Sequence, residues 1–83
     1  MGKHDATLRS LFDEPTRANI KWPDVEALLA YLGADISEGS GSRVRVALND
    51  VRAVFHRPHP EKEISRPGVR SVQRFLREAG IEP

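Results

Sequence analysis

The stretch from Arg43 to His56 constrains the fold of this chain more than any other. Every second residue from Val44 to Leu48 is apolar and bulky, whereas the residues between them are arginine or alanine. This period of two is typical of a strand with one buried face. Val51 to His56 alternates in the same way, and Asn49-Asp50 suits a two-residue hairpin turn because both residue types tolerate positive φ. The sequence therefore predicts an antiparallel hairpin.

Three other stretches have the spacing of amphipathic helices. In residues 23–32 the apolar stripe is Val25, Leu28, Leu29 and Leu32, with Pro23 in the first turn and Gly33 at the end. In residues 67–80 it is Val69, Val72, Phe75, Leu76 and Ala79. A shorter stripe of Leu8, Leu11 and Phe12 follows a possible cap at Asp5 and stops at Pro15.

Residues 34–38 alternate weakly and predict a third strand, while residues 13–21 are expected to form a connector. The order is then α-α-β-β-β-α in one domain, since 83 residues leave no room for a second. We expect an α+β fold in which the helices cover one face of a three-stranded antiparallel sheet. The open face would carry Arg43, Arg45, Arg52 and His56.

Composition excludes several kinds of site. The chain has no cysteine, so disulfides, thiolate catalysis and cysteine zinc sites are absent. No acidic residue stands at a recognised ligand spacing from His56 and His59, so we expect neither a metal nor a cofactor. No apolar run approaches about 18 residues, and the N-terminus lacks the apolar stretch of a signal peptide. We therefore expect a cytoplasmic protein that does not enter a membrane.

The charges are unevenly distributed. Residues 1–40 carry a net charge of −3 and residues 41–83 one of +4, and eight of the ten arginines follow Ser42. Because the guanidinium group matches phosphate geometry, this half is suited to an anionic partner such as RNA. A solvated surface with a mild dipole is the alternative interpretation. The candidate RNA-binding residues are Ser42, Arg45, Arg52, Arg57, Arg70 and Arg74.

The hairpin also predicts a site for chemistry. With a turn at Asn49-Asp50, Arg43 pairs with His56, which brings their Cβ atoms to roughly 5 Å. A histidine can take a proton from a ribose 2′-hydroxyl while an arginine stabilises the charge on the adjacent phosphate. His59 follows three residues later and can serve as a second proton-transfer group. A solvated surface pair is the alternative.

Several short motifs resemble the HicA family of toxins. These are the run from His59 to Ile64, the helix around residues 72–76 and the ending Leu76-Arg77-Glu78-Ala79-Gly80-Ile81. Gly41-Ser42 before a strand is similar to the Gly-Ser-His motif of that family. The resemblance covers roughly residues 20–81, so residues 1–83 form a single HicA-like domain with a short extra N-terminal helix.

The resemblance implies a fold like that of double-stranded-RNA-binding domains. It also implies an RNA endonuclease (mRNA interferase) of a type II toxin-antitoxin system, neutralised by a HicB-like antitoxin. In the family the catalytic histidine follows Gly-Ser, but here that position is Arg43. Either catalysis has moved across the hairpin to His56, with His59 in support, or the chain is a non-catalytic module that binds RNA or a protein.

Overall fold

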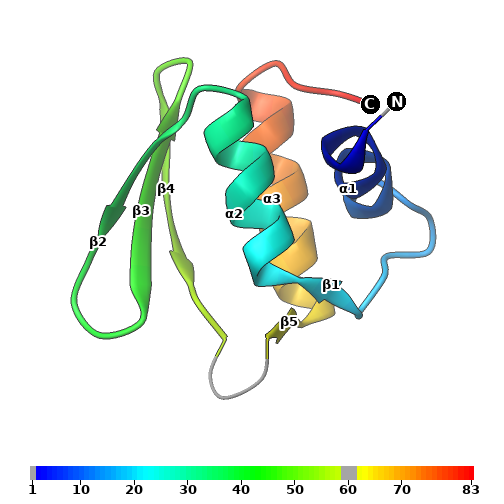
Figure 1. Cartoon of the computed structure of the whole chain (residues 1–83), viewed down its shortest axis with the longest axis horizontal. Coiled ribbons are helices and arrows are strands. Elements are labelled where there is room, and N and C mark those ends of the chain that lie inside the picture. The colour runs from blue at the N-terminus through cyan, green and yellow to red at the C-terminus, as the bar shows by residue number, and fades with distance from the viewer. Residues whose placement is uncertain (1, 59–61) are drawn as a thin grey trace.

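A computed structural model gives the fold and describes residues 2–58 and 62–83. Three helices and five strands follow one another along the chain (Figure 1). The helices are α1 (Lys3–Leu11), α2 (Trp22–Tyr31) and α3 (Arg66–Glu78). The strands are β1 (Ile20–Lys21), β2 (Asp35–Glu38), β3 (Arg43–Leu48), β4 (Val51–His56) and β5 (Glu63–Ile64). The expected order of three helices and a three-stranded sheet is confirmed, and β1 and β5 are additional.

The predicted hairpin is confirmed in both its bounds and its register. Strands β2, β3 and β4 form an antiparallel sheet in that order, with β3 in the centre. Arg43 pairs with His56 and Leu48 with Val51, so the loop consists of Asn49 and Asp50. Their φ angles are 50° and 68°, as a two-residue hairpin turn with positive φ requires. The Asn49 side-chain amide also donates to the carbonyl oxygen of Ala79 at 2.8 Å, which ties the turn to the end of α3.

One face of this sheet is covered by α2 and α3 (Figure 1). Val44, Val46 and Phe55 point to that side and are buried. The Phe55 ring meets the Phe75 ring of α3 edge-on, with centroids 5.6 Å apart. Both stripes predicted for the longer helices contribute to this core, and the opposite face of the sheet remains open.

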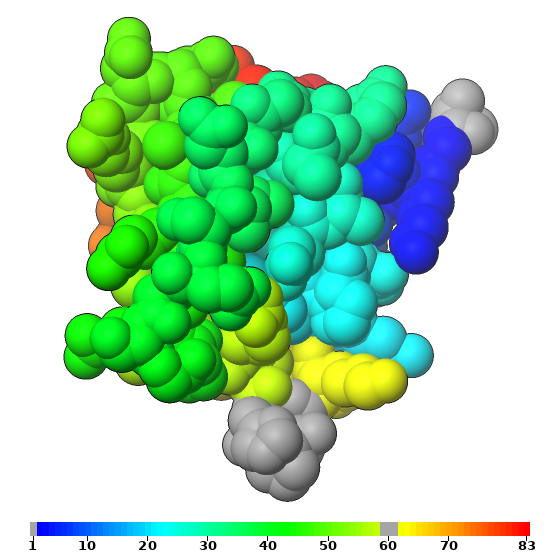
Figure 2. Space-filling view, turned by 60° about the vertical axis from the view of Figure 1, so that its left-hand side comes forward, coloured from blue at the N-terminus to red at the C-terminus, as the bar shows by residue number. Residues whose placement is uncertain are grey.

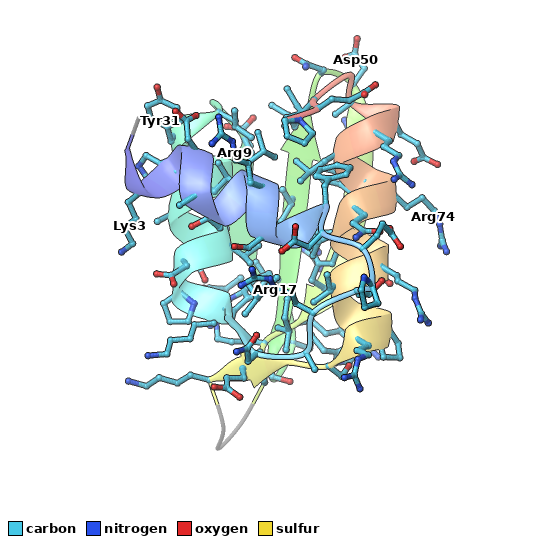
Figure 3. The ribbon with its side chains drawn as sticks, turned by 90° about the vertical axis from the view of Figure 1, so that its right-hand side faces the viewer. Lys3, Arg9, Arg17, Tyr31, Asp50 and Arg74 are labelled. Carbon is cyan, nitrogen blue, oxygen red and sulfur yellow. The ribbon has the colours of Figure 1, made fainter. Side chains whose placement is uncertain are left out.

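Helix α1 forms a further layer. It lies across α2 and α3 on the side away from the sheet (Figure 3), and Figure 2 shows α1 and the sheet on opposite sides of α2. Leu11 is fully buried there, and the Gln73 side-chain amide donates to its carbonyl oxygen. The last carbonyls of a helix lack partners within the helix, so this buried glutamine satisfies one of them. The expected cap at Asp5 is wrong: α1 begins at Lys3 after Gly2, and Asp5 lies in the first turn.

Residues 13–19 form the expected connector, but the expectation is wrong for residues 20 and 21. Ile20 and Lys21 pair with Ile64 and Glu63 in a two-stranded antiparallel ribbon. The Trp22 amide then donates to the carbonyl oxygen of Lys62 at 2.7 Å. The ribbon therefore holds the chain that precedes α3 against the start of α2. In the described ranges, none of the helices has the length and apolar composition that crossing a bilayer requires.

Replacing Asn49 tests how the hairpin turn is stabilised. Asn49→Ala removes the hydrogen bond to Ala79 and places an alanine at positive φ, so we expect a loss of about 2 kcal/mol in the free energy of unfolding. Asn49→Gly removes only the hydrogen bond and should cost about 1 kcal/mol. Urea unfolding followed by circular dichroism measures both. Equal losses would show that the positive φ contributes nothing.

Candidate active site on the open sheet face

Side chains on the open face form three rows across the sheet. Arg43 and His56 make the first row, at the end away from the hairpin turn. The second row is Ser37, Arg45 and Val54, and the third is Asp35, Ala47 and Arg52. All but the half-buried Ala47 are exposed, and Val54, at 56% exposure, is one of two large apolar side chains exposed among the described residues. Basic, imidazole and apolar groups and the carboxylate of Asp35 therefore share one accessible surface.

The first row brings together the two residues that the sequence analysis paired. Arg43 and His56 are direct cross-strand partners and both are exposed. One residue further, the Arg57 amide donates to the carbonyl oxygen of Ser42 at 2.8 Å, which continues the strand pairing past this row. The backbone on both sides of the pair is thereby held in place. His59 lies outside the described residues.

The arginines of the open face have no carboxylate partner among the described residues. None of Arg43, Arg45 and Arg52 takes part in the ion pairs that the described part of the chain forms. A shallow hollow of about 550 Å³ lies over the second and third rows, between Arg45, Arg52 and Val54. Asp35 also lines this hollow, but among the ion pairs of the described residues none joins it to an arginine. The guanidinium donors therefore remain available to an anionic ligand.

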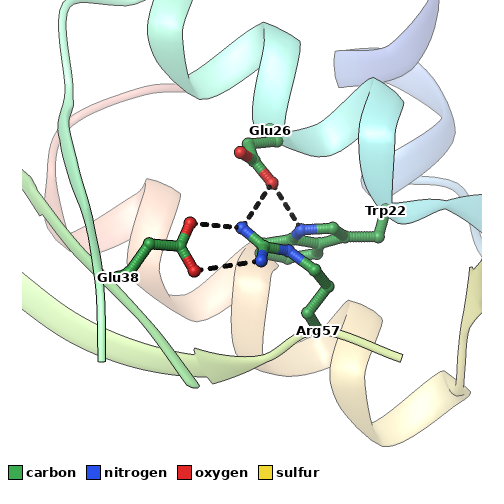
Figure 4. Close-up of polar contacts among 4 residues, drawn as sticks. All are labelled: Trp22, Glu26, Glu38 and Arg57. Atoms are coloured by element: carbon green, nitrogen blue, oxygen red, sulfur yellow. Dashed lines mark hydrogen bonds and ion pairs between the residues drawn. The ribbon is translucent and has the colours of Figure 1, made fainter. Parts of the chain in front are cut away.

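Arg57 lies on the other side of the sheet. Since side chains alternate along a strand, Arg57 follows the buried Phe55 to the helix-covered side. Its guanidinium group binds both carboxylate oxygens of Glu38 at 3.1 and 2.9 Å and one of Glu26 at 3.4 Å (Figure 4). We call these three residues the Arg57 clasp. The structure thus places this predicted RNA-binding residue among carboxylates and away from the open face.

The clasp joins three separate elements. Glu26 comes from α2, Glu38 from the end of β2 and Arg57 from the chain after β4. The same Glu26 oxygen accepts a hydrogen bond of 2.7 Å from the Trp22 indole, whose ring is buried against Phe55. Trp22 is therefore a core residue. The hydrogen bond from Arg57, followed by its positive charge, lowers the pKa of Glu38 below its ordinary value of 4.5.

The remaining candidates lie elsewhere on the surface. Ser42 is exposed in the turn before β3, beside the first row. Arg70 and Arg74 are exposed on α3, and Arg74 points outward from the flank of that helix (Figure 3). Arg77 follows Arg74 by three residues on the same helix, and its guanidinium carbon lies 5.2 Å from the centre of the Phe12 ring. In the part of the chain that the structure describes, no three His, Asp or Glu side chains gather as metal ligands do.

The acid sensitivity of the clasp provides a test. Because folding lowers the pKa of Glu38, its contribution to stability is complete above pH 4.5 and is lost as the pH falls through the lower folded-state value. Glu38→Gln should therefore unfold at a lower temperature than the wild type at pH 7, and the two melting temperatures should converge as the pH falls below the folded-state pKa of Glu38. Glu82→Gln is the matched control at an exposed position. A difference in melting temperature that stays constant as the pH is lowered from 7 would contradict this role of the carboxylate.

Comparison with known proteins supports one family. The model of the family described as HicA toxin of bacterial toxin-antitoxin matches residues 22–81. Neither the curated proteins nor the solved structures contain a match. The matched range begins at α2 and includes the whole sheet, β5 and α3, whereas α1 and β1 precede it. Because this range is most of the chain, the protein belongs to the HicA toxin family of bacterial toxin-antitoxin systems.

Proposed function

We propose that this toxin is a metal-independent RNA endonuclease that cleaves mRNA in the cytoplasm and is neutralised by a HicB-like antitoxin. The observation that carries the proposal is the pairing of His56 with Arg43 on the open face. Arg43 follows Gly41-Ser42, where the family has its catalytic histidine. The imidazole of His56 therefore belongs to the same row of the sheet as that position.

In the proposed reaction His56 acts as the general base. It takes the proton of a ribose 2′-hydroxyl, whose oxygen then attacks the adjacent phosphorus. The bond from phosphorus to the 5′-oxygen of the next nucleotide breaks, which leaves a 2′,3′-cyclic phosphate and a 5′-hydroxyl. Arg43 donates hydrogen bonds to the phosphate oxygens as negative charge develops on them. A proton must also reach the departing 5′-oxygen, and we assign this supporting role to His59.

The arginine positions support a path for the RNA backbone. Arg45 and Arg52 continue from Arg43 along the open face, and Ser42 borders its first row. We propose that these three residues bind phosphates flanking the cleaved bond. Arg70 and Arg74 would extend contact to a longer RNA over the flank of α3. For Arg57 the clasp supports another role, namely holding the end of β4 so that His56 stays opposite Arg43.

The same surface supports inhibition by a protein partner. Unpaired arginines beside the exposed Val54 offer both charge and apolar area to an acidic partner. We propose that the HicB-like antitoxin covers this open face and so denies RNA access to His56. This arrangement would join neutralisation and catalysis at one surface.

Cleavage assays with single variants test the catalytic assignment. We expect the wild type to cleave total RNA in the presence of EDTA and to leave cyclic phosphate ends. His56→Ala should lower the rate by about 10²- to 10⁴-fold and Arg43→Ala by about 10²- to 10³-fold. Gel electrophoresis of labelled RNA measures the rates, and mass spectrometry identifies the ends.

His4→Ala is the matched control. His4 lies on α1, away from the open face, and its ring stacks on the Tyr31 ring of α2. Its rate should equal that of the wild type. Undiminished cleavage by His56→Ala would refute the assignment of the base. RNA that is bound but left intact by the wild type would favour the non-catalytic RNA-binding module, and an antitoxin that binds while RNA does not would favour a protein-interaction module.

The salt dependence of RNA binding tests the backbone path. Each phosphate contact contributes about 0.7 to the slope of log affinity against log salt for single strands. Arg45→Ala and Arg52→Ala should each lower the slope by about that amount, whereas Arg17→Ala, which removes a surface arginine paired with Asp13, should not. Fluorescence anisotropy with a labelled, 2′-O-methylated RNA measures the slopes without cleavage. Unchanged slopes in both open-face variants would refute this path.

A further inference from the structure

A second hollow adjoins the catalytic candidate on the side of α3. It measures about 530 Å³ and lies between the last residues of β4 and the first two turns of α3. We call it the β4–α3 cleft. Its rim includes Val54, His56, Pro58, Glu63, Ser65 and Ser71, and the buried Trp22 and Phe55 lie at its base. This volume falls within the range of small-molecule sites.

The cleft meets the open face along β4. Val54 lines both the cleft and the hollow between Arg45 and Arg52, and His56 belongs to both the cleft and the first row. A nucleotide whose phosphate lies on the arginine side can therefore place its base on the other side of the same strand. The exposed side chain of Val54, at 56%, lies at the boundary.

The two hollows differ in charge. None of the described residues that line the cleft is lysine or arginine, and the exposed Glu63 is the acidic residue among them. A carboxylate repels phosphate and accepts hydrogen bonds from neutral donors. The cleft is therefore suited to an uncharged group. In the open-face hollow two arginines outnumber the one acidic residue, Asp35, so that hollow is suited to the phosphate.

The start of α3 does not change this conclusion. Helix N-termini attract phosphate because their first amides lack partners. Here Pro67 has no amide hydrogen, Gly68 donates to the Ser65 hydroxyl oxygen at 3.3 Å, and Val69 donates to the Ser65 carbonyl oxygen at 2.9 Å. Most donors of an anion site are thus absent or occupied.

We infer that the β4–α3 cleft binds a base of single-stranded RNA next to the cleaved phosphate and selects guanine. This inference rests on the proposed function. Guanine presents two adjacent N–H donors on its pairing edge, which match the two carboxylate oxygens of Glu63. The Ser65 hydroxyl accepts from Gly68 and retains its own hydrogen for the guanine carbonyl oxygen. Adenine and cytosine would turn acceptors toward the carboxylate, and uracil offers a single N–H.

Binding of uncleavable RNA tests the inference separately from catalysis. We would titrate the full chain with 2′-O-methylated tetranucleotides in which one uridine is replaced by guanosine, adenosine or cytidine. The guanosine oligonucleotide should bind about fivefold more tightly than the others. This factor is at the low end of the discrimination that a bidentate hydrogen-bonded contact provides, because Glu63 is exposed. In ¹⁵N-¹H NMR spectra, the backbone amide signals of Val54 and Ser71 should shift when the guanosine oligonucleotide is added.

Two variants locate the preference. Glu63→Gln should abolish the fivefold preference for guanine, and it should change the affinity for all-uridine RNA by no more than Glu78→Gln does. Glu78→Gln makes the same change in charge at an exposed position of α3 outside the cleft and should keep the preference. Ser71→Leu, which fills the cleft from α3 without removing a charge, should also abolish it. Circular dichroism would show that each variant is folded.

Several outcomes would overturn the inference. One is equal affinity for the four oligonucleotides, and another is a preference for guanine that Glu63→Gln leaves intact. The inference also fails if inorganic phosphate reproduces the shifts of the amide signals at the cleft, or if only an antitoxin protein causes them. The proposed nuclease function fails independently, if unmodified RNA stays intact while guanine is still preferred. Cleavage without any base preference would overturn the cleft assignment alone.

Discussion

The two-residue turn at Asn49-Asp50 determines which side chains lie on which face of the sheet. A shift of one residue in the β3–β4 register would move every side chain of one strand to the opposite face. Positive φ at both turn residues and the hydrogen bond from Asn49 to α3 hold the register in place. Burial of Val44 and Phe55 against the helices opposes the same shift. The position of His56 opposite Arg43 is therefore a consequence of the turn and of core packing together.

The same alternation separates two classes of arginine. Arg43, Arg45 and Arg52 stand on the open face, where water solvates their charge and no carboxylate partner is required. Arg57 turns to the helix-covered side, and its side chain is only 35% exposed. A partly buried charge is costly without a counter-charge, and Glu26 and Glu38 supply it there. The alternation of side chains along β4 and the residue after it thus decides whether an arginine remains available to a ligand, as Arg52 does, or is held in internal ion pairs, as Arg57 is.

Features with a clear period were predictable from the sequence, and features created by tertiary contact were not. The hairpin and the two long helices follow from periods of 2 and 3.6, as does the Arg43–His56 pair. The β1–β5 ribbon was missed because two-residue strands have no measurable period. The inward direction of Arg57 was readable from the alternation that buries Phe55, but its acidic partners come from α2 and β2. Likewise, Gln73 is buried because α1 ends beside it.

Under the proposed function, it matters that the imidazole stands on β4 and not at the position after Gly41-Ser42. Directly paired residues share a face and have Cβ atoms about 5 Å apart, so the imidazole stays in the same row. However, β3 is the central strand and β4 is an edge strand of the three-stranded sheet. In this chain the imidazole therefore borders the β4–α3 cleft, and the guanidinium group occupies the centre of the sheet beside Arg45. Under the proposed function, the phosphate would be held over the middle of the sheet while proton transfer takes place at its edge, where a base can leave the backbone path and enter the cleft.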